Sequence, residues 1–201
     1  MNITNSIYPD DISGTIIGVT GVKRSGKDSI AVRLVEEYGF VRYAFADPIK
    51  IACKGIFGFT DEQCWGDLKD VVDEYWKITP RKIFQIFGTE LFQYELPKHA
   101  KELADIGRGF WVYVFARWYE RQLAKYPDIK IVVTDVRFPF EADMITRLGG
   151  TIIKVARSEQ LDPDMHASET EMNLIPYSDL IENTGSLTDL YHKIDKRFKL
   201  W

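Results

Sequence analysis

The chain of 201 residues carries 26 basic and 30 acidic side chains, and its formal net charge of −4 gives no global basic field to recruit nucleic acid. Hydrophobic residues make up 45% of the chain and aromatic residues 13%, enough to fill the core of one domain. The longest apolar runs, at residues 15–20 and 129–134, are too short to span a bilayer, and residues 1–11 lack the features of a secretory signal. We therefore expect a cytoplasmic protein with no membrane or nucleic-acid partner.

The two cysteines, Cys53 and Cys64, have no CxxC spacing and no histidine at a metal-ligand spacing. Free thiols that are buried or half-buried are therefore expected, in a reducing compartment.

Short apolar runs alternate along the chain with segments of helical spacing. In chain order, the expected elements are a strand at 15–20, a helix at 29–38, a strand at 40–46, helices from 47 and over 79–94, a helix at 111–126, a strand at 129–134, a helix at 141–148, strands at 151–156 and 179–182, and a helix at 187–200. Residues 1–13 are expected to be loose. Strands that alternate with helices predict parallel βαβ units and an α/β sandwich.

Capping residues mark two of these helix starts. Asp47 precedes Pro48, and Thr79 precedes Pro80, so each pair predicts an N-cap followed by proline at the first helical position. Residues 58–80 give no clear assignment. Residues 95–108 are expected to be a polar connection, and 157–173 a lid.

The sequence GVKRSGKDS at residues 21–29 lies between the first strand and the first helix. Gly21, Gly26 and Lys27 satisfy the GxxxxGK pattern of a phosphate loop. The glycines let backbone N–H groups point at phosphate oxygens, Lys27 can reach the β- and γ-phosphates, and the helix presents its positive end to the same anion. The other loop residues expected to contact the nucleotide are Val22, Lys23, Arg24, Ser25, Asp28 and Ser29.

Asp28 departs from the usual pattern, which has a serine or threonine as a magnesium ligand. Either Asp28 holds Mg²⁺, directly or through water, or Ser29 substitutes for the missing hydroxyl. The sequence leaves both open.

The loop, with aspartate after its lysine, resembles that of the bacteriophage deoxynucleoside monophosphate kinases. Further segments resemble this family in the same order along the chain: Ala46-Asp-Pro-Ile-Lys50, Pro80-Arg81, Phe87-Gly-Thr-Glu90, Phe110-Trp-Val112, Asp135-Val-Arg137 with Glu141, His166 to Glu169, and Asn183-Thr-Gly185. The matches span about residues 15–190. One departure is size, since the acceptor-binding region here is compact.

The resemblance implies a three-layer α/β/α P-loop NTPase fold, adenylate-kinase-like, with a mostly parallel five-stranded sheet. It implies one kinase domain over residues 1–201, with an acceptor-binding insert at 47–110 and a lid at 157–173. The implied reaction phosphorylates deoxynucleoside monophosphates with ATP and Mg²⁺. Small nucleotides are then the partners, and a homodimer is left open.

Transfer of a phosphoryl group between two anions needs cations and alignment rather than a general base. The residues expected to act in catalysis are Lys27, Arg137 and Arg157. Asp28 and Asp135 are expected near the metal, and Asn183 and Gly185 beside the donor adenine. The residues expected to bind the acceptor are Asp47, Lys50, Arg81, Trp111, Asp135, Arg137 and Glu141.

Each assignment has a structural alternative. Arg137 could form a surface ion pair with Glu141, Asp135 could cap a turn, and Arg81 could be an exposed first-turn arginine. Trp111 could belong to the core.

Other functions also remain open at the level of sequence. A kinase acting on phosphomevalonate or a coenzyme A precursor would use the same loop and arginines. A GTP-hydrolysing switch is disfavoured because no NKxD motif follows the loop, and the acidic balance disfavours a nucleic-acid-binding ATPase. A scaffold with an inactive loop is the least favoured alternative, given an intact Lys27.

Overall fold

The computed structural model describes residues 15–157 and 171–198. The chain forms two compact units: Met1–Ala44 with Ala116–Trp201, and Phe45–Phe115. The expected insert at 47–110 falls within the second unit. Of the expected lid at 157–173, residues 158–170 lie outside the described residues. Residues 1–13 and residues 199–200 of the expected last helix also lie outside them.

The first unit contains a five-stranded sheet in the order β2-β3-β1-β4-β5, and all of its neighbouring pairs are parallel. The strands are β1 (Thr15–Thr20), β2 (Val41–Tyr43), β3 (Lys130–Val133), β4 (Thr151–Ala156) and β5 (Asp179–Glu182). The expected parallel α/β sheet is therefore confirmed. The second strand is shorter than the expected 40–46 because residues 45 and 46 already turn into the next helix.

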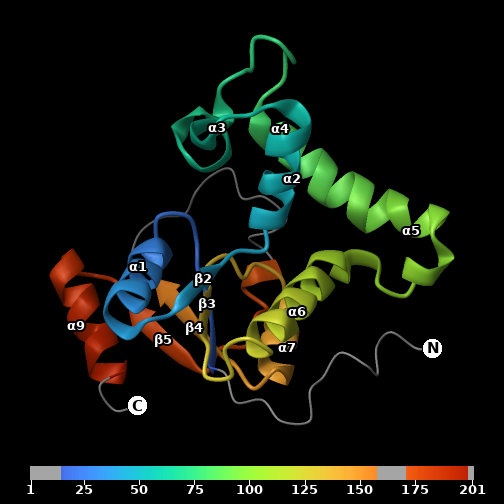
Figure 1. Cartoon of the computed structure of the whole chain (residues 1–201). Coiled ribbons are helices and arrows are strands. Elements are labelled where there is room, and N and C mark those ends of the chain that lie inside the picture. The colour runs from blue at the N-terminus through green and yellow to red at the C-terminus, as the bar shows by residue number, and fades with distance from the viewer. Residues whose placement is uncertain (1–14, 158–170, 199–201) are drawn as a thin grey trace. The chain divides into compact units, whose positions relative to one another are not determined.

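Helices cover both faces of this sheet, which gives the three layers (Figure 1). These helices are α1 (Lys27–Tyr38) and α9 (Leu187–Phe198) on one face and α7 (Pro139–Arg147) on the other. Ile17 and Val19 of β1 pack in one core cluster with residues of α1 and α9. Gly18, between them, faces α7, where an added Cβ would lie 2.9 Å from Ile145 Cδ1. This alternation is the period of two expected of a strand buried on both faces.

The strand order indicates the end of β1 as the position where a binding site is expected. β1 lies between β3 and β4, and β2 lies beyond β3 on one side while β5 lies beyond β4 on the other. In open parallel sheets, ligands bind at the carboxyl ends of the strands where the strand order reverses. The loop after β1 occupies this position.

The second unit is helical. Its elements are α2 (Asp47–Phe57), α3 (Asp61–Trp65), η2 (Asp67–Asp70), α4 (Pro80–Gln85), the π-helix η3 (Ile86–Glu95), α5 (Leu96–His99), η4 (Lys101–Leu103), η5 (Gly107–Gly109) and the start of α6 (Phe110–Leu123), which continues into the first unit. Cys53, Phe59 and Cys64 form its buried cluster. Both cysteines are free and buried, as expected, and burial raises the pKa of Cys53 to about 11.

Two expectations about this unit are wrong in detail. Asp47 is not an N-cap, because Ala46 takes that position in a helical conformation and Asp47 lies in the first turn. The helix expected over 79–94 begins as predicted, with the Thr79 hydroxyl accepting the Lys82 N–H, but it changes into the π-helix at Ile86. A hydrophobic period of 3.6 gives no signal for such a change.

Within residues 15–157 and 171–198, no helix combines the length and apolar character that crossing a bilayer requires.

Candidate functional site

The loop between β1 and α1 requires both of its glycines. Gly21 has a φ of +147°, and an added Cβ would lie 2.4 Å from the carbonyl oxygen of Val155 in β4. Gly26 has a φ of +108°, and its Cβ would lie 2.6 Å from the side-chain nitrogen of Asn183. Any larger residue would clash and would also adopt a strained backbone conformation. These two close approaches show that the curled loop lies directly against the backbone of β4 and the side chain of Asn183, just after β5.

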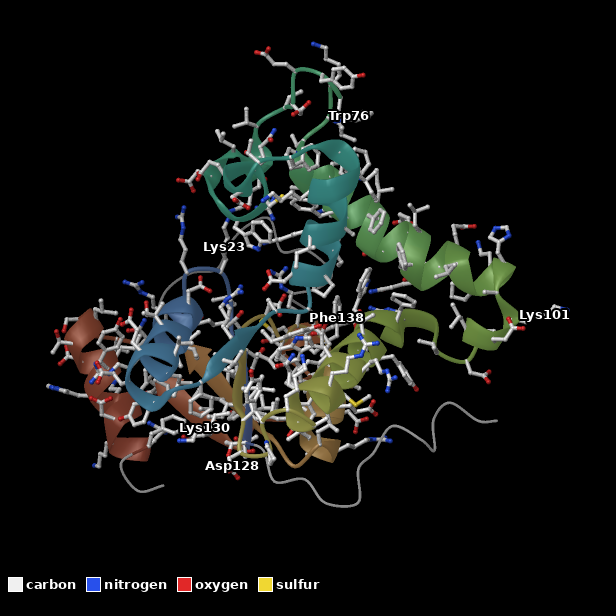
Figure 2. The ribbon with its side chains drawn as sticks, in the orientation of Figure 1. Lys23, Trp76, Lys101, Asp128, Lys130 and Phe138 are labelled. Carbon is white, nitrogen blue, oxygen red and sulfur yellow. The ribbon has the colours of Figure 1, made fainter. Side chains whose placement is uncertain are left out.

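The loop is closed on itself by its own polar groups. The Ser25 N–H donates to Val22 O at 3.2 Å, and the Lys27 ammonium donates to the same oxygen at 2.7 Å. Lys27 thus reaches across the loop, while Lys23 is exposed on its outer side (Figure 2). Gly26 is the N-cap of α1 and provides no side-chain cap, so the orphan N–H groups of the first turn are available to an anion.

Two hydroxyl groups at this loop suit an oxygen-rich ligand. Thr20 Oγ1 and Ser25 Oγ are buried and have no hydrogen-bond partner in the described part of the chain. Buried polar groups are normally satisfied, and exceptions often mark sites completed by a ligand. Phosphate oxygens or a hydrated cation fit this demand.

The carboxylates are too few to form a metal site of protein ligands alone. In the described ranges, no group of three or more His, Cys, Asp or Glu side chains could hold a metal ion. Asp28 is exposed in the first turn of α1, and Asp135 is half-buried just after β3. This arrangement suits Mg²⁺, which typically binds through one or two carboxylates together with substrate phosphates.

A cavity of about 320 Å³ opens beside the loop. It is lined by Arg24, Gly26, Asp28, Ser29, Arg157, Asn183, Gly185, Leu187 and Leu190. The Arg157 guanidinium donates to Arg24 O at 3.3 Å, so this arginine lies against the phosphate loop. The structure therefore brings Arg157, Asn183 and Gly185 together with residues of the loop around one cavity.

The turn after β3 lies next to the end of β1. The Val136 N–H donates to Val19 O at 3.3 Å, which places Asp135 and Arg137 on either side of that contact. Arg137 is exposed. An exposed arginine at the carboxyl end of this sheet is well placed to meet a bound anion.

Glu141 is buried at the start of α7 and holds this turn from behind. Its Oε2 accepts the N–H of Arg137 at 2.7 Å and that of Phe138 at 3.0 Å. Burial, followed by the nearby charge of Asp135, raises the pKa of Glu141 to about 8, although the two N–H donors act in the opposite direction. Glu141 therefore contacts the backbone of Arg137 rather than lying open to solvent.

In the second unit, Trp65 joins two of the expected acceptor residues. Its indole N–H donates to Asp47 Oδ1 at 2.9 Å. The ammonium groups of Lys50 and Lys54 lie 5.9 and 6.0 Å from the centre of its ring, within the range of cation–π attraction. No sequence pattern indicated a role for Trp65, because this residue lies in a five-residue helix whose contacts with α2 leave no periodic signal.

The other two expected acceptor residues of this unit have partners within it. The Arg81 guanidinium forms a two-point contact with the carboxylate of Asp70, and this pairing raises its pKa. Trp111 is only 8% exposed, and its indole N–H donates to Gly88 O at 2.7 Å. A ligand of Arg81 would have to compete with Asp70, whereas Trp111 helps to hold the π-helix.

Comparison with known proteins places these features in a family. The family model described as deoxynucleotide monophosphate kinase matches residues 15–64 and 57–194. A putative deoxynucleotide monophosphate kinase of Acanthamoeba polyphaga mimivirus is 36% identical, over 89% of this chain and 93% of its own length. The deoxynucleotide monophosphate kinase of Enterobacteria phage T4 is 25% identical, over 92% of this chain and 99% of its own length. Among solved structures, a dephospho-CoA kinase from Campylobacter jejuni aligns over 94% of this chain and 97% of its own, with 18% identity and a TM-score of 0.47.

Proposed function

Because the chain belongs to the deoxynucleotide monophosphate kinase family, we propose that it transfers the γ-phosphoryl group of ATP to a deoxynucleoside monophosphate. The bond between the γ-phosphorus and the β–γ bridging oxygen breaks, and a bond forms between that phosphorus and an oxygen of the acceptor phosphate. The products are ADP and a deoxynucleoside diphosphate. The phosphate loop carries the proposal: Gly21 and Gly26 have the positive φ of a tightly curled loop, and the Lys27 ammonium binds within that loop.

The charges near the loop support phosphoryl transfer. The acceptor oxygen is already an anion, so the chain has to overcome repulsion between two phosphates and align them. Lys27 neutralises the donor phosphates, and Arg157 lies against the same loop. Arg137, after β3, clamps the acceptor phosphate or the transferred group through its planar guanidinium.

Mg²⁺ would be held by the nucleotide phosphates together with Asp28 or Asp135, and it would neutralise charge on the β- and γ-phosphoryl oxygens. The buried hydroxyls of Thr20 and Ser25 would complete the polar lining of this position. The donor adenine would occupy the cavity between Arg24, Arg157 and Gly185.

Residues of the second unit would select the acceptor. Asp47 and Lys50 lie on the first turn of α2 and are held by Trp65. Arg81 would exchange its contact with Asp70 for the acceptor phosphate. Trp111 would act through Gly88, which it binds in the π-helix.

The proposal is tested by measuring initial rates of ADP release with ATP and Mg²⁺ against a panel of acceptors. The panel holds each dNMP, the ribonucleotides, phosphomevalonate and dephospho-coenzyme A, and Lys27→Ala is the blank. Turnover on one or more dNMPs that is lost in the blank is the expected result. Turnover on phosphomevalonate or dephospho-coenzyme A alone would overturn the acceptor assignment and leave the phosphate loop assignment standing.

A further inference from the structure

Asn183 links the phosphate loop to the turn after β5. Its side-chain nitrogen donates to Ser25 O at 2.8 Å, and its backbone N–H donates to Ala156 O at 2.7 Å. Only 9% of Asn183 is exposed. The residue is therefore anchored to β4 through its backbone and holds the loop through its side chain.

The bond to Ser25 O fixes the orientation of one peptide group in the loop. A trans peptide is planar, and its carbonyl oxygen and the following N–H point in opposite directions. When Asn183 holds the Ser25 oxygen, the Gly26 N–H is directed away from Asn183. Inward-pointing N–H groups are what a phosphate loop uses to bind phosphate oxygens.

Gly26 is fitted to this contact. An added Cβ at Gly26 would lie 2.6 Å from Asn183 Nδ2 and 3.2 Å from Leu190 Cδ2. The glycine therefore allows the amide to come close to the loop as well as giving the loop its positive φ of +108°. The contact therefore depends on an amide side chain at 183 and on a glycine at 26, which a hydrogen bond between exposed surface residues does not require.

We propose that Asn183 is a positioning residue, which holds the phosphate loop in its phosphate-binding conformation. This role goes beyond a contact with the donor base, and it rests on the proposed function only in requiring that the loop bind the phosphates of ATP. The buried hydroxyl of Ser25, which has no partner among the described residues, belongs to the residue whose carbonyl Asn183 holds. Asn183 thus orients a residue that is ready to accept a ligand.

The two roles are separated by a ligand that has phosphates and no base. We would measure dissociation constants for ATP and for inorganic tripolyphosphate by calorimetry, with the wild type, Asn183→Ala and Asn183→Asp. Loss of one buried hydrogen bond to the loop is expected to weaken both ligands about tenfold in Asn183→Ala. Asn183→Asp is expected to weaken both further, because an ionised carboxylate has no proton to donate to Ser25 O.

A matched control loosens the same turn without touching the loop. Asp189 Oδ2 accepts the Ser186 N–H at 2.8 Å and its hydroxyl at 2.7 Å. Asp189→Ala removes both bonds and is expected to leave the affinity for either ligand within about twofold. Asp189 is exposed, and loss of its carboxylate costs mainly helix-cap stability.

The outcomes distinguish the positioning role from the proposed function. A loss of ATP affinity alone, with tripolyphosphate unchanged, would overturn the positioning role in favour of a base contact, and unchanged affinities would overturn it outright. If Lys27→Ala binds tripolyphosphate as well as the wild type does, the phosphate loop assignment fails and both proposals fall. If tripolyphosphate behaves as expected and no acceptor is phosphorylated, the proposed function fails while the role of Asn183 stands.

Discussion

The carboxyl group of Glu141 accepts the backbone N–H of Arg137 at 2.7 Å through Oε2, across a single turn of chain. Glu141 is buried, whereas Arg137 is exposed after β3. The buried residue therefore fixes the backbone from which the exposed guanidinium extends. Glu141 thus supports Arg137 through its backbone, and the guanidinium charge of Arg137 is not used in this hydrogen bond.

The burial of Glu141 predicts a specific pH dependence of stability. Its pKa in the folded protein is about 8, raised from the ordinary 4.5 first by burial and then by Asp135. The folded state therefore holds a proton that the unfolded state releases, so this contribution is fully present below pH 4.5 and is lost as the pH rises through 8. The loss is on the order of a few kcal/mol.

Glu141→Gln removes this titration and keeps an oxygen acceptor for the two N–H groups. We expect the free energy of unfolding of the wild type to fall relative to that of Glu141→Gln between pH 5 and about 8, and to run parallel above that. Denaturant titrations at four or five pH values measure the difference. Parallel curves over the whole range would show that Glu141 is not protonated in the folded state.

Gly21 and Gly39 form a matched pair for testing the phosphate loop. Both have positive φ, at +147° and +71°, but only Gly21 approaches another backbone, with a Cβ position 2.4 Å from Val155 O. Gly39→Ala is expected to cost about 1 kcal/mol of stability with no effect on nucleotide affinity. Gly21→Ala is expected to cost at least 1–3 kcal/mol from strain and to abolish ATP binding. Equal ATP affinity of the two variants in calorimetry would contradict the role of Gly21.

Trp65 and Trp76 form a second matched pair. Both are partly exposed, at 38% and 42%, and both donate their indole N–H, Trp65 to Asp47 Oδ1 and Trp76 to Phe57 O. Trp65→Phe is expected to raise the KM for the dNMP about fivefold, equivalent to one hydrogen bond of about 1 kcal/mol, with kcat and the KM for ATP unchanged.

Trp76→Phe is expected to leave all three parameters unchanged, because the Trp76 ring packs against Phe57 and Tyr75, which are not expected acceptor residues. Figure 2 shows Trp76 in the loop that precedes α4. Similar acceptor KM values for Trp65→Phe and Trp76→Phe in steady-state assays would exclude a positioning role for Trp65.

Trp111 is expected to act mainly on stability. Phenylalanine at this position keeps a ring against Phe92 and Phe110 but leaves the carbonyl of Gly88 without its indole donor. Trp111→Phe is therefore expected to lower the free energy of unfolding by about 1–3 kcal/mol. The KM for the acceptor should change less than twofold. A large rise in that KM with unchanged stability would identify Trp111 as a direct acceptor contact.

The features that were predictable from sequence are local ones. A strand, two glycines, a lysine and the start of a helix, which together identify the phosphate loop, fall within fifteen consecutive residues, from 15 to 29. The end of the first helix at residue 38 and the cap at Thr79 are local in the same sense, and both are confirmed.

The features that escaped the sequence depend on contacts between distant segments or on departures from regular helix geometry. Asn183 and Ser25 are separated by 158 positions, so no spacing rule connects them. The π-helix at Ile86–Glu95 has an apolar pattern that also suits an α-helix. Aspartate is a residue type that favours the N-cap position, but the helical conformation already begins at Ala46, one residue before Asp47.

The most direct test of the central claim is to follow the nucleotide products when the protein is given ATP, Mg²⁺ and a dNMP, by separating and quantifying them over time. We expect dNDP and ADP to appear in equal amounts, and neither to form with Lys27→Ala. If ATP yields ADP and inorganic phosphate but no dNDP with every dNMP offered, the proposed phosphoryl transfer to a dNMP is wrong, and the chain is a nucleotide hydrolase.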